Sequence, residues 1–251
     1  MTKINSSTTY NMKIQDKIAL ITGGTKGIGL GIAESMLAEG MKVAITGRSH
    51  EGIEKALAGF TDSQKNNIIG IVADVTSMEA MQAAVAQTLT KWQKIDVVIA
   101  NAGVGHFASI EDLTADQWKQ TIDVNLTGVF NTVKTSLDPI KKSEGYFITV
   151  ASLAGTNFFA KGTAYNASKF GLVGFTQAMM LDLRQYGIKC STIMPGSVST
   201  YFNNHTPSES DAWKIQPEDI GQMTVDLLKM NPRTLPSKIE VRPTMPPGSK
   251  K

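Results

Sequence analysis

The sequence predicts an α/β fold in which helices cover both faces of a single parallel, doubly wound sheet. Seven short apolar runs of strand length alternate along the chain with longer segments that have the period of a helix. The short runs lack a regular alternation of apolar and polar residues, which is typical of strands that are covered on both faces. No linker, repeat or low-complexity block divides the sequence. We therefore expect one domain of about seven strands.

The predicted elements follow one another from end to end of the chain. The predicted strands are residues 17–22, 42–46, 67–72, 96–100, 146–151, 188–193 and 238–242. The helix candidates between them include residues 78–92, 115–137, 163–185 and 217–230. The last candidate starts with Pro217, followed by Glu218 and Asp219, and a proline with acidic neighbours is typical of the first turn of a helix.

The composition is that of a globular protein, with 251 residues, 41% of them hydrophobic, and a net charge of +3. Lysine and arginine are spread along the chain, so we expect no nucleic-acid partner. The single Cys190 excludes an internal disulfide and fits a reducing compartment, and three scattered histidines argue against a metal site. No long apolar stretch predicts a membrane span or a signal peptide. We expect a cytoplasmic protein with a disordered extension over residues 1–13 and one domain over residues 14–251.

Gly23, Gly27 and Gly29 follow the first predicted strand in the stretch LITGGTKGIG. In a doubly wound sheet this turn is where a dinucleotide pyrophosphate binds, because glycines let the backbone approach and the helix N-terminus has unpaired N–H groups. The spacing is Gly-x3-Gly-x-Gly, whereas the common fingerprint is Gly-x-Gly-x2-Gly. The motif alone could be a tight turn, but its place between a strand and a helix favours nucleotide binding.

Six further landmarks follow the glycine motif in a fixed order along nearly the whole chain. They are ADV (73–75), NAG (101–103), DVNLTG (123–128), Ser152 after the fifth strand, YNASK (165–169) and PGSVST (195–200). Together with TGGTKGIG (22–29), this set resembles the short-chain dehydrogenase/reductase family in its form of about 250 residues, and it is similar to the 3-oxoacyl-acyl-carrier-protein reductases. The resemblance implies a Rossmann-type fold.

Four residues at the family's positions are the candidate catalytic group. Tyr165 and Lys169 are four residues apart, so they lie on one face of their helix. A phenol with an ordinary pKa near 10 is a poor acid–base group at neutral pH, and a neighbouring ammonium lowers that pKa. The resemblance implies that Tyr165 is the acid–base and that Lys169 lowers its pKa and holds the nicotinamide ribose. It also implies that Ser152 hydrogen-bonds the substrate oxygen and that Asn125 helps to hold a water in the proton relay.

Each of these four residues also has an ordinary explanation when it is taken alone. Tyr165 and Lys169 could be part of a solvated helix face, Ser152 could cap a loop, and Asn125 could bond to backbone inside a helix. Their joint occurrence at the family's relative positions favours catalysis.

The end of the second predicted strand favours NADP(H) over NAD(H). Family members that prefer NAD usually carry an acidic residue there, which binds the ribose hydroxyls. Here Gly47 is followed by Arg48, which can form a bidentate contact to a 2′-phosphate, with Lys26 as a second cation. The alternative is that Arg48 is a solvated loop arginine.

By resemblance, Asp74 contacts the adenine amino group and Thr200 bonds the nicotinamide carboxamide. The expected cofactor-binding residues are Gly23, Thr25, Lys26, Gly27, Ile28, Gly29, Arg48, Asp74, Val75, Asn101, Ala102, Gly103, Tyr165, Lys169, Pro195, Gly196, Val198 and Thr200.

The segment between Thr200 and Pro217 usually forms the substrate lid in such proteins, and here it is short. It offers Tyr201, Phe202, His205 and Trp213 as candidate lining residues, with His106 and Phe107 on the opposite wall. Each of them could equally make no contact with substrate.

The leading hypothesis is an NADP(H)-dependent oxidoreductase that transfers a hydride between nicotinamide and a carbonyl or secondary alcohol substrate. The first alternative is a non-catalytic NADP-binding sensor or regulatory protein on the same fold. The second is an epimerase or dehydratase, which the compact length and the complete catalytic group disfavour. We expect a homodimer or homotetramer, with the helices 115–137 and 163–185 as candidate contact faces, and no metal.

Overall fold

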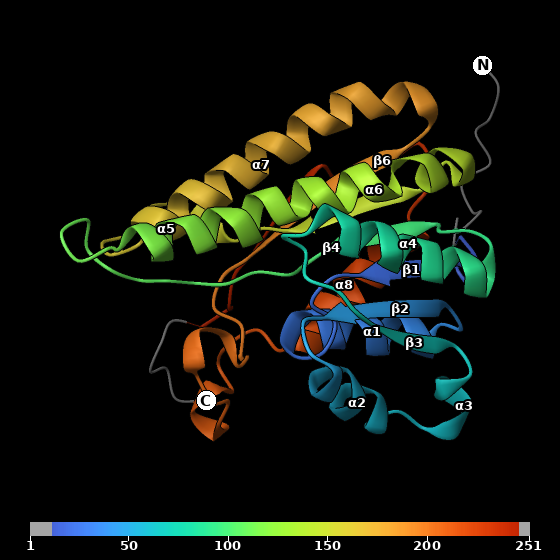
Figure 1. The fold of residues 1–251 in the computed structure, drawn as a ribbon, viewed down its shortest axis with the longest axis horizontal. Helices are drawn as coiled ribbons and strands as arrows, with labels where there is room; N and C mark the ends of the chain where they lie inside the picture. The colour runs from blue at the N-terminus through green and yellow to red at the C-terminus, as the bar shows by residue number, and fades with distance from the viewer. Residues whose placement is uncertain (1–11, 246–251) are drawn as a thin grey trace, which may run out of the picture.

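Seven parallel strands form one sheet in the computed structural model, which describes residues 12–245 (Figure 1). Their order across the sheet is β3-β2-β1-β4-β5-β6-β7. The strands are β1 (Ile18–Ile21), β2 (Lys42–Gly47), β3 (Ile68–Val72), β4 (Val97–Ala100), β5 (Tyr146–Val150), β6 (Lys189–Pro195) and β7 (Lys238–Val241). The order reverses between β1 and β4, and a doubly wound sheet binds its ligand outside the carboxyl ends of the strands at such a point. The predicted fold class is therefore confirmed.

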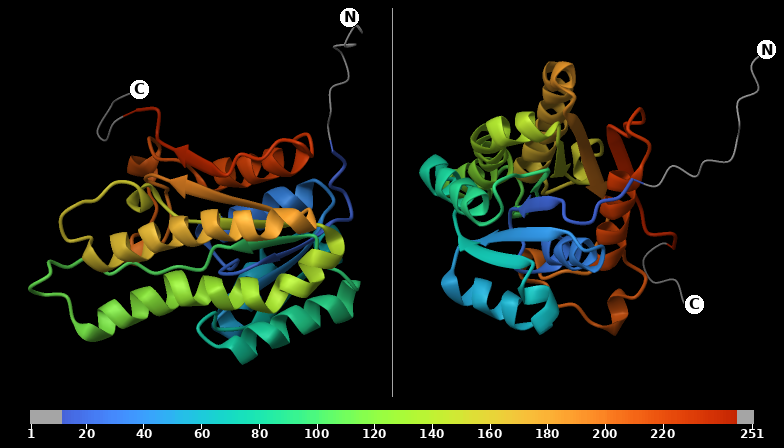
Figure 2. Two further views of the ribbon diagram at one scale, coloured as in Figure 1. Left: turned by 90° about the horizontal axis from the view of Figure 1, so that it is seen from above. Right: turned by 90° about the vertical axis from the view of Figure 1, so that its right-hand side faces the viewer.

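Helices cover both faces of this sheet, as Figures 1 and 2 show. α1, α2 and α8 pack on one face, and α4, α6 and α7 pack on the other. The helices are α1 (Gly27–Ala38), α2 (His50–Ala58), α3 (Asp62–Lys65), α4 (Met78–Trp92), α5 (Ala115–Ile122), α6 (Gly128–Ser143), α7 (Thr163–Leu183) and α8 (Pro217–Lys229).

Each face of the sheet has its own apolar core. In β1 the consecutive residues Leu20 and Ile21 are both fully buried, Leu20 against the α4, α6 and α7 layer and Ile21 against the α1 and α8 layer. Successive side chains of a strand point to opposite faces, so both must be apolar when helices cover both faces. This burial explains why the strand sequences lack alternation.

Two glycines let α1 and α8 cross at close range. A Cβ added to Gly31 would lie 2.6 Å from the carbonyl oxygen of Pro217, and one added to Gly221 would lie 2.5 Å from that of Gly31. Neither position can hold a larger side chain without moving backbone. This contact fixes the start of α8, and with it the end of the lid segment.

The predicted helix 115–137 is longer and less regular than expected. α5 is followed by a π-helical turn, Asp123–Thr127, and α6 continues to Ser143. Pro139 lies inside α6 and does not end it, because the next residue, Ile140, is fully buried and holds the last turn against the core. The helix ends where Glu144 adopts a left-handed conformation with φ 47°.

The other element boundaries differ from the prediction by a few residues. β6 runs to Pro195 because its end pairs with β7, where Pro195 lies opposite Val241. α7 ends at Leu183 and continues as a short 3-10 turn, Arg184–Tyr186. Residues 1–11 of the expected extension lie outside the described residues. No helix within residues 12–245 is long and apolar enough to cross a membrane.

Candidate active site

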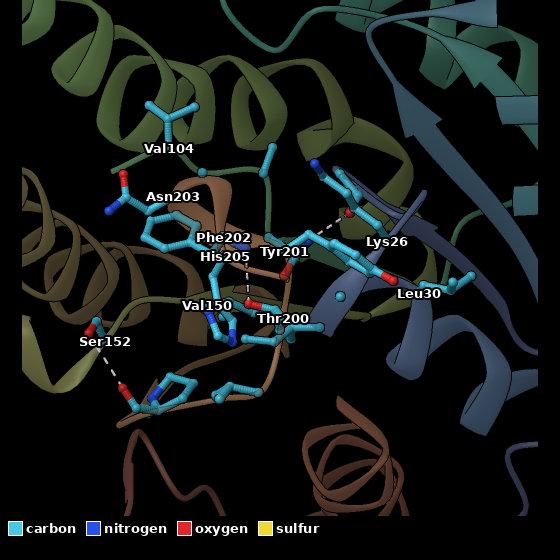
Figure 3. A pocket seen from close by; sticks show the side chains of 18 of the residues that line it. Lys26, Leu30, Val104, Val150, Ser152, Thr200, Tyr201, Phe202, Asn203 and His205 are labelled. Atoms are coloured by element: carbon cyan, nitrogen blue, oxygen red, sulfur yellow. Dashed lines mark hydrogen bonds between the residues drawn. The ribbon is translucent and has the colours of Figure 1, made fainter. Parts of the chain in front are cut away.

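A cavity of about 1850 Å³ lies at the carboxyl ends of the strands, lined by residues that end or follow β2, β3, β4, β5 and β6. Of the expected cofactor-binding and catalytic residues, all except Gly29 and Asn125 line this cavity. Figure 3 shows Lys26, Ser152 and Thr200 together with the lid residues Tyr201 and Phe202 around it. The structure therefore brings the motifs to one place, although they are spread over most of the sequence.

The glycine turn forms a tight cradle that no side chain could enter. Gly23 and Gly27 have positive φ of 65° and 56°, and a Cβ on Gly23 would lie 2.9 Å from Cα of Ala102. A Cβ on Gly29 would lie 2.4 Å from the carbonyl oxygen of Gly23, so Gly29 serves the packing of the turn although it does not line the cavity.

The N-terminus of α1 has no internal cap. Lys26, in the capping position, is extended and its side chain accepts no hydrogen bond from the first turn. The first N–H groups of a helix attract anions such as phosphate. With the glycine cradle beside it, this terminus fits a pyrophosphate.

Asn101 and Thr22 lock the glycine turn to β4. The Asn101 side-chain amide donates hydrogen bonds to the carbonyl oxygens of Thr22 (2.9 Å) and Gly23 (3.0 Å). The Thr22 hydroxyl oxygen accepts from the backbone N–H groups of Asn101 and Ala102. The Asn101 amide therefore positions the cradle, which the sequence did not reveal.

A glycine ends β2, and a larger residue there would require the Thr25 side chain to move, since a Cβ on Gly47 would lie 2.6 Å from Cγ2 of Thr25. The neighbouring Arg48 and Lys26 both line the cavity, and neither forms a salt bridge with another described residue. The Asp74 carboxylate, which also lines the cavity, is held by Thr76, whose N–H and hydroxyl both donate to Oδ1.

Ser152 and Tyr165 meet at the inner end of the cavity. Ser152 precedes a short 3-10 turn. Its hydroxyl oxygen accepts a hydrogen bond from the N–H of Ala154, and its O–H group donates one to the carbonyl oxygen of Pro195 at 3.4 Å. Burial raises the pKa of Tyr165 to about 12, while a hydrogen bond with Ser152 acts in the opposite direction. The net shift of this pKa is upward, whereas the sequence led us to expect a lowered value. Loss of hydration of the phenolate outweighs the neighbouring groups.

Lys169 is buried beside Tyr165, one turn further along α7. Its Nζ donates to the carbonyl oxygen of Val150 at 3.0 Å and lies 5.7 Å from the centre of the Tyr165 ring. Burial lowers the pKa of Lys169 to about 8. A lysine that is only 4% exposed is costly unless it has a function.

Asn125 lies in the π-helical turn, and both polar atoms of its side chain form hydrogen bonds within the protein. Its Oδ1 accepts from the N–H of Val104 at 2.8 Å, and its Nδ2 donates to the Val104 carbonyl oxygen and to the Ser168 hydroxyl. The side chain therefore fixes the loop after β4. The expected part of Asn125 in a water relay stays a prediction.

The lid contains two short 3-10 turns, Phe202–Asn204 and Glu209–Asp211. A buried carboxylate holds it together, since Asp211 accepts from His205 at 2.6 Å and from Lys214 at 2.5 Å. Hydrogen bonds with Lys214 and then His205 are the main causes that lower the pKa of Asp211 to about 2.

All four candidate lining residues of the lid line the cavity, namely Tyr201, Phe202, His205 and Trp213. Phe107 also lines it, from the loop after β4. His106 does not line it, and its Nε2 lies 2.6 Å from Oε1 of Gln120 instead. Sequence reasoning missed Asn157, Phe158 and Phe159, which line the cavity from the loop between β5 and α7. The adjacent Phe158 and Phe159 in a predicted loop were the sequence signal that could have indicated an apolar cavity wall.

The sequence and the fold are similar to those of known oxidoreductases. The short chain dehydrogenase family model matches residues 17–211. An oxidoreductase of Staphylococcus saprophyticus is 30% identical over 92% of this chain and 99% of its own. The trans-4-hydroxycyclohexanecarboxylate dehydrogenase of Sinomonas cyclohexanicum is 34% identical over 75% of this chain and 74% of its own.

Among solved structures, the alcohol dehydrogenase of the archaeon Thermococcus sibiricus, complexed with 5-hydroxy-NADP, is similar with a TM-score of 0.85 and 27% identity. The match covers 91% of this chain and 97% of that one. The chain belongs to the short-chain dehydrogenase family of oxidoreductases.

Proposed function

We propose that this oxidoreductase transfers a hydride between NADP(H) and a carbonyl or secondary alcohol substrate, with Tyr165 as the acid–base. The observation that carries the proposal is the meeting of Ser152, Tyr165 and Lys169 at the inner end of a cavity whose other end is the glycine cradle. When bound, NADPH would supply the hydride that reduces the carbonyl carbon.

The protein's own groups handle the proton and hold the substrate. The Ser152 hydroxyl and the Tyr165 phenol orient the carbonyl oxygen between them. With a pKa raised to about 12, the phenol carries its proton at neutral pH, which is the form needed to protonate the oxygen as the carbon is reduced. Oxidation of an alcohol requires the phenolate, which a protonated Lys169 stabilises.

The preference for NADP(H) is part of this proposal. Its support is Gly47, which stands where an acidic residue would bind the ribose hydroxyls of NAD, and the two cations, Arg48 and Lys26, which line the cavity. The archaeal alcohol dehydrogenase, which was solved with an NADP derivative, is consistent with it. Thr200, whose side chain lies against Gly27, would bond the nicotinamide carboxamide.

Replacing both cations tests this proposal. Arg48→Asp is expected to weaken NADPH binding by about 10- to 100-fold, since a hydrogen bond to a charged group contributes ~1.5–3 kcal/mol and ~1.4 kcal/mol is tenfold. NADH has no 2′-phosphate to lose, so its binding should change much less. The readout is the ratio of kcat/KM for NADPH and NADH in wild type, Arg48→Asp and the double variant with Lys26→Ala.

Lys91→Ala is the matched control, because Lys91 is an exposed lysine of α4 that does not line the cavity. A wild type that prefers NADH, or a ratio that the double variant does not change, would contradict NADP(H) selection by these cations. Tight binding of NADPH without reduction of any carbonyl compound would favour the non-catalytic alternative.

We also propose a homo-oligomer that contacts through α5, α6 and α7. Large apolar side chains are exposed on these helices, namely Trp118, Phe130, Phe170 and Leu181. Exposed apolar side chains on adjacent helices are typical of a contact surface. The cytoplasmic location stays a prediction that rests on the single cysteine, Cys190.

A further inference from the structure

Three phenylalanine rings form a cluster with Tyr165 in the cavity: Phe107 and Phe202 pack against Tyr165, and Phe159 packs against Phe107. Phe107 is the centre of the group, with ring centroids 5.3 Å from Tyr165, 5.8 Å from Phe159 and 6.4 Å from Phe202. Each of these three pairs meets edge to face, at interplanar angles of 60° to 74°. The rings come from three separate loops, so the fold has assembled them at this one place.

The Phe202 ring of the lid packs against the backbone at Gly105, in the loop after β4. A Cβ added to Gly105 would lie 2.6 Å from the ring of Phe202 and 3.2 Å from that of Phe107. Phe202 also lies 5.7 Å from Tyr165. Phe107 and Phe159 nevertheless keep 39% and 47% of their surface exposed, so apolar ring surface remains open for a ligand.

The basic side chains of the lid and of Arg242 that line this end of the cavity form ion pairs with other described residues. Lys214 and His205 share the carboxylate of Asp211, and Arg242 forms a 3.0 Å ion pair with Glu240. Lys26, Arg48 and Lys55, which form no salt bridge with another described residue, lie at the cofactor end instead. Lys169 lies beside Tyr165, but it is only 4% exposed and its Nζ donates to the carbonyl oxygen of Val150. A carboxylate or phosphate on the substrate would therefore find no exposed, unpaired cation among the described residues at the ring cluster.

From the ring cluster and the paired charges we infer that the substrate is an uncharged ketone with an aryl ring next to the carbonyl. This inference rests on the proposed function, because it takes Tyr165 and Ser152 as the groups that hold the carbonyl oxygen. With the oxygen there, the group attached to the carbonyl carbon must lie against Phe107 and Phe202. An aryl ring on the substrate can pack edge to face against these phenylalanine rings, whereas a saturated or charged group cannot.

A matched set of ketones tests the inference with NADPH and the full chain. Acetophenone, 4-acetylbenzoate, cyclohexyl methyl ketone and a 3-oxoacyl coenzyme A thioester differ in ring type and in charge. We expect kcat/KM for acetophenone to exceed that for each of the others by at least about tenfold. A higher kcat/KM for 4-acetylbenzoate or the thioester would overturn the inference and leave the proposed function standing. No NADPH oxidation with any carbonyl compound would reject both.

Variants of the ring cluster test whether these phenylalanines determine the preference for an aryl ketone. Phe107→Leu is expected to lower the ratio of kcat/KM for acetophenone to that for cyclohexyl methyl ketone by about tenfold, and using the ratio cancels any general effect on Tyr165. Phe159→Leu repeats the test with a more exposed ring, should Phe107→Leu fold poorly.

Tyr186→Leu is the matched control. It removes an aromatic ring of similar exposure, and it lies 21 residues beyond Tyr165, about 30 Å away at ~1.5 Å per helical residue. Its ratio should equal that of wild type. Unchanged ratios in both phenylalanine variants would contradict a role of the cluster in substrate selection.

Discussion

Tyr165→Phe is expected to lower kcat by at least ~100-fold, because general acid–base catalysis usually contributes 10²–10⁴. The ring remains to pack against Phe107, while the proton donor and the hydrogen bond with Ser152 are lost. The NADPH dissociation constant should stay within a few-fold of wild type. The measurements are steady-state kinetics and fluorescence titration of NADPH.

Tyr186→Phe removes a hydroxyl outside the cavity and serves as the control for this change. It should retain wild-type kcat. If Tyr165→Phe kept activity within a few-fold of wild type, another group would have to donate the proton, and Tyr165 would be no more than part of the wall.

Lys169→Met is expected to lower kcat and to weaken NADPH binding, because the Lys169 ammonium takes part in both catalysis and cofactor binding in the proposed mechanism. Loss of one preorganised charge near the reacting oxygen typically costs 10²–10³ in kcat. Loss of a charged hydrogen bond to the ribose should weaken NADPH binding by about tenfold or more. Lys91→Met, an exposed lysine on α4, is the matched control and should change neither quantity.

The burial of Lys169 also has a signature that does not depend on activity. Its pKa is about 8 in the folded protein, below its ordinary value of 10.5. Between these two pH values the unfolded chain binds more protons at this residue than the folded one, so its contribution to the free energy of unfolding rises with pH. The difference between wild type and Lys169→Met in denaturant titrations should follow that slope. A pH-independent difference together with normal NADPH affinity would show that Lys169 is only a structural residue.

Much of the fold could be predicted because the physical signals are local. Leu20 and Ile21 show that β1 is buried on both faces, and the glycines that follow mark a turn where side chains do not fit. The position of Tyr165 and Lys169 on one helical face follows from their spacing alone. Local signals fall short at Pro139, because a proline usually ends a helix, whereas α6 continues past it to Ser143.

The parts that could not be predicted depend on partners distant in sequence. Asn125 gives no hint that its amide is bonded to Val104 and Ser168, and Asn101 gives none that it holds the glycine turn. The direction of the Tyr165 pKa shift depends on how deeply the fold buries the phenol, which spacing does not reveal. The ring cluster also combines three loops whose meeting is a property of the tertiary structure.

Deuterium transfer tests most directly whether this chain moves a hydride from NADPH to a carbonyl carbon. NADPH labelled at one or the other face of the nicotinamide C4 would be incubated with the protein and acetophenone or another carbonyl compound that it reduces. We predict an alcohol with one deuterium on the former carbonyl carbon, from only one of the two labelled cofactors, with Tyr165→Phe giving at most about one hundredth of the product. NADPH binding with no deuterium in any alcohol product across a broad carbonyl panel would contradict the proposed reaction.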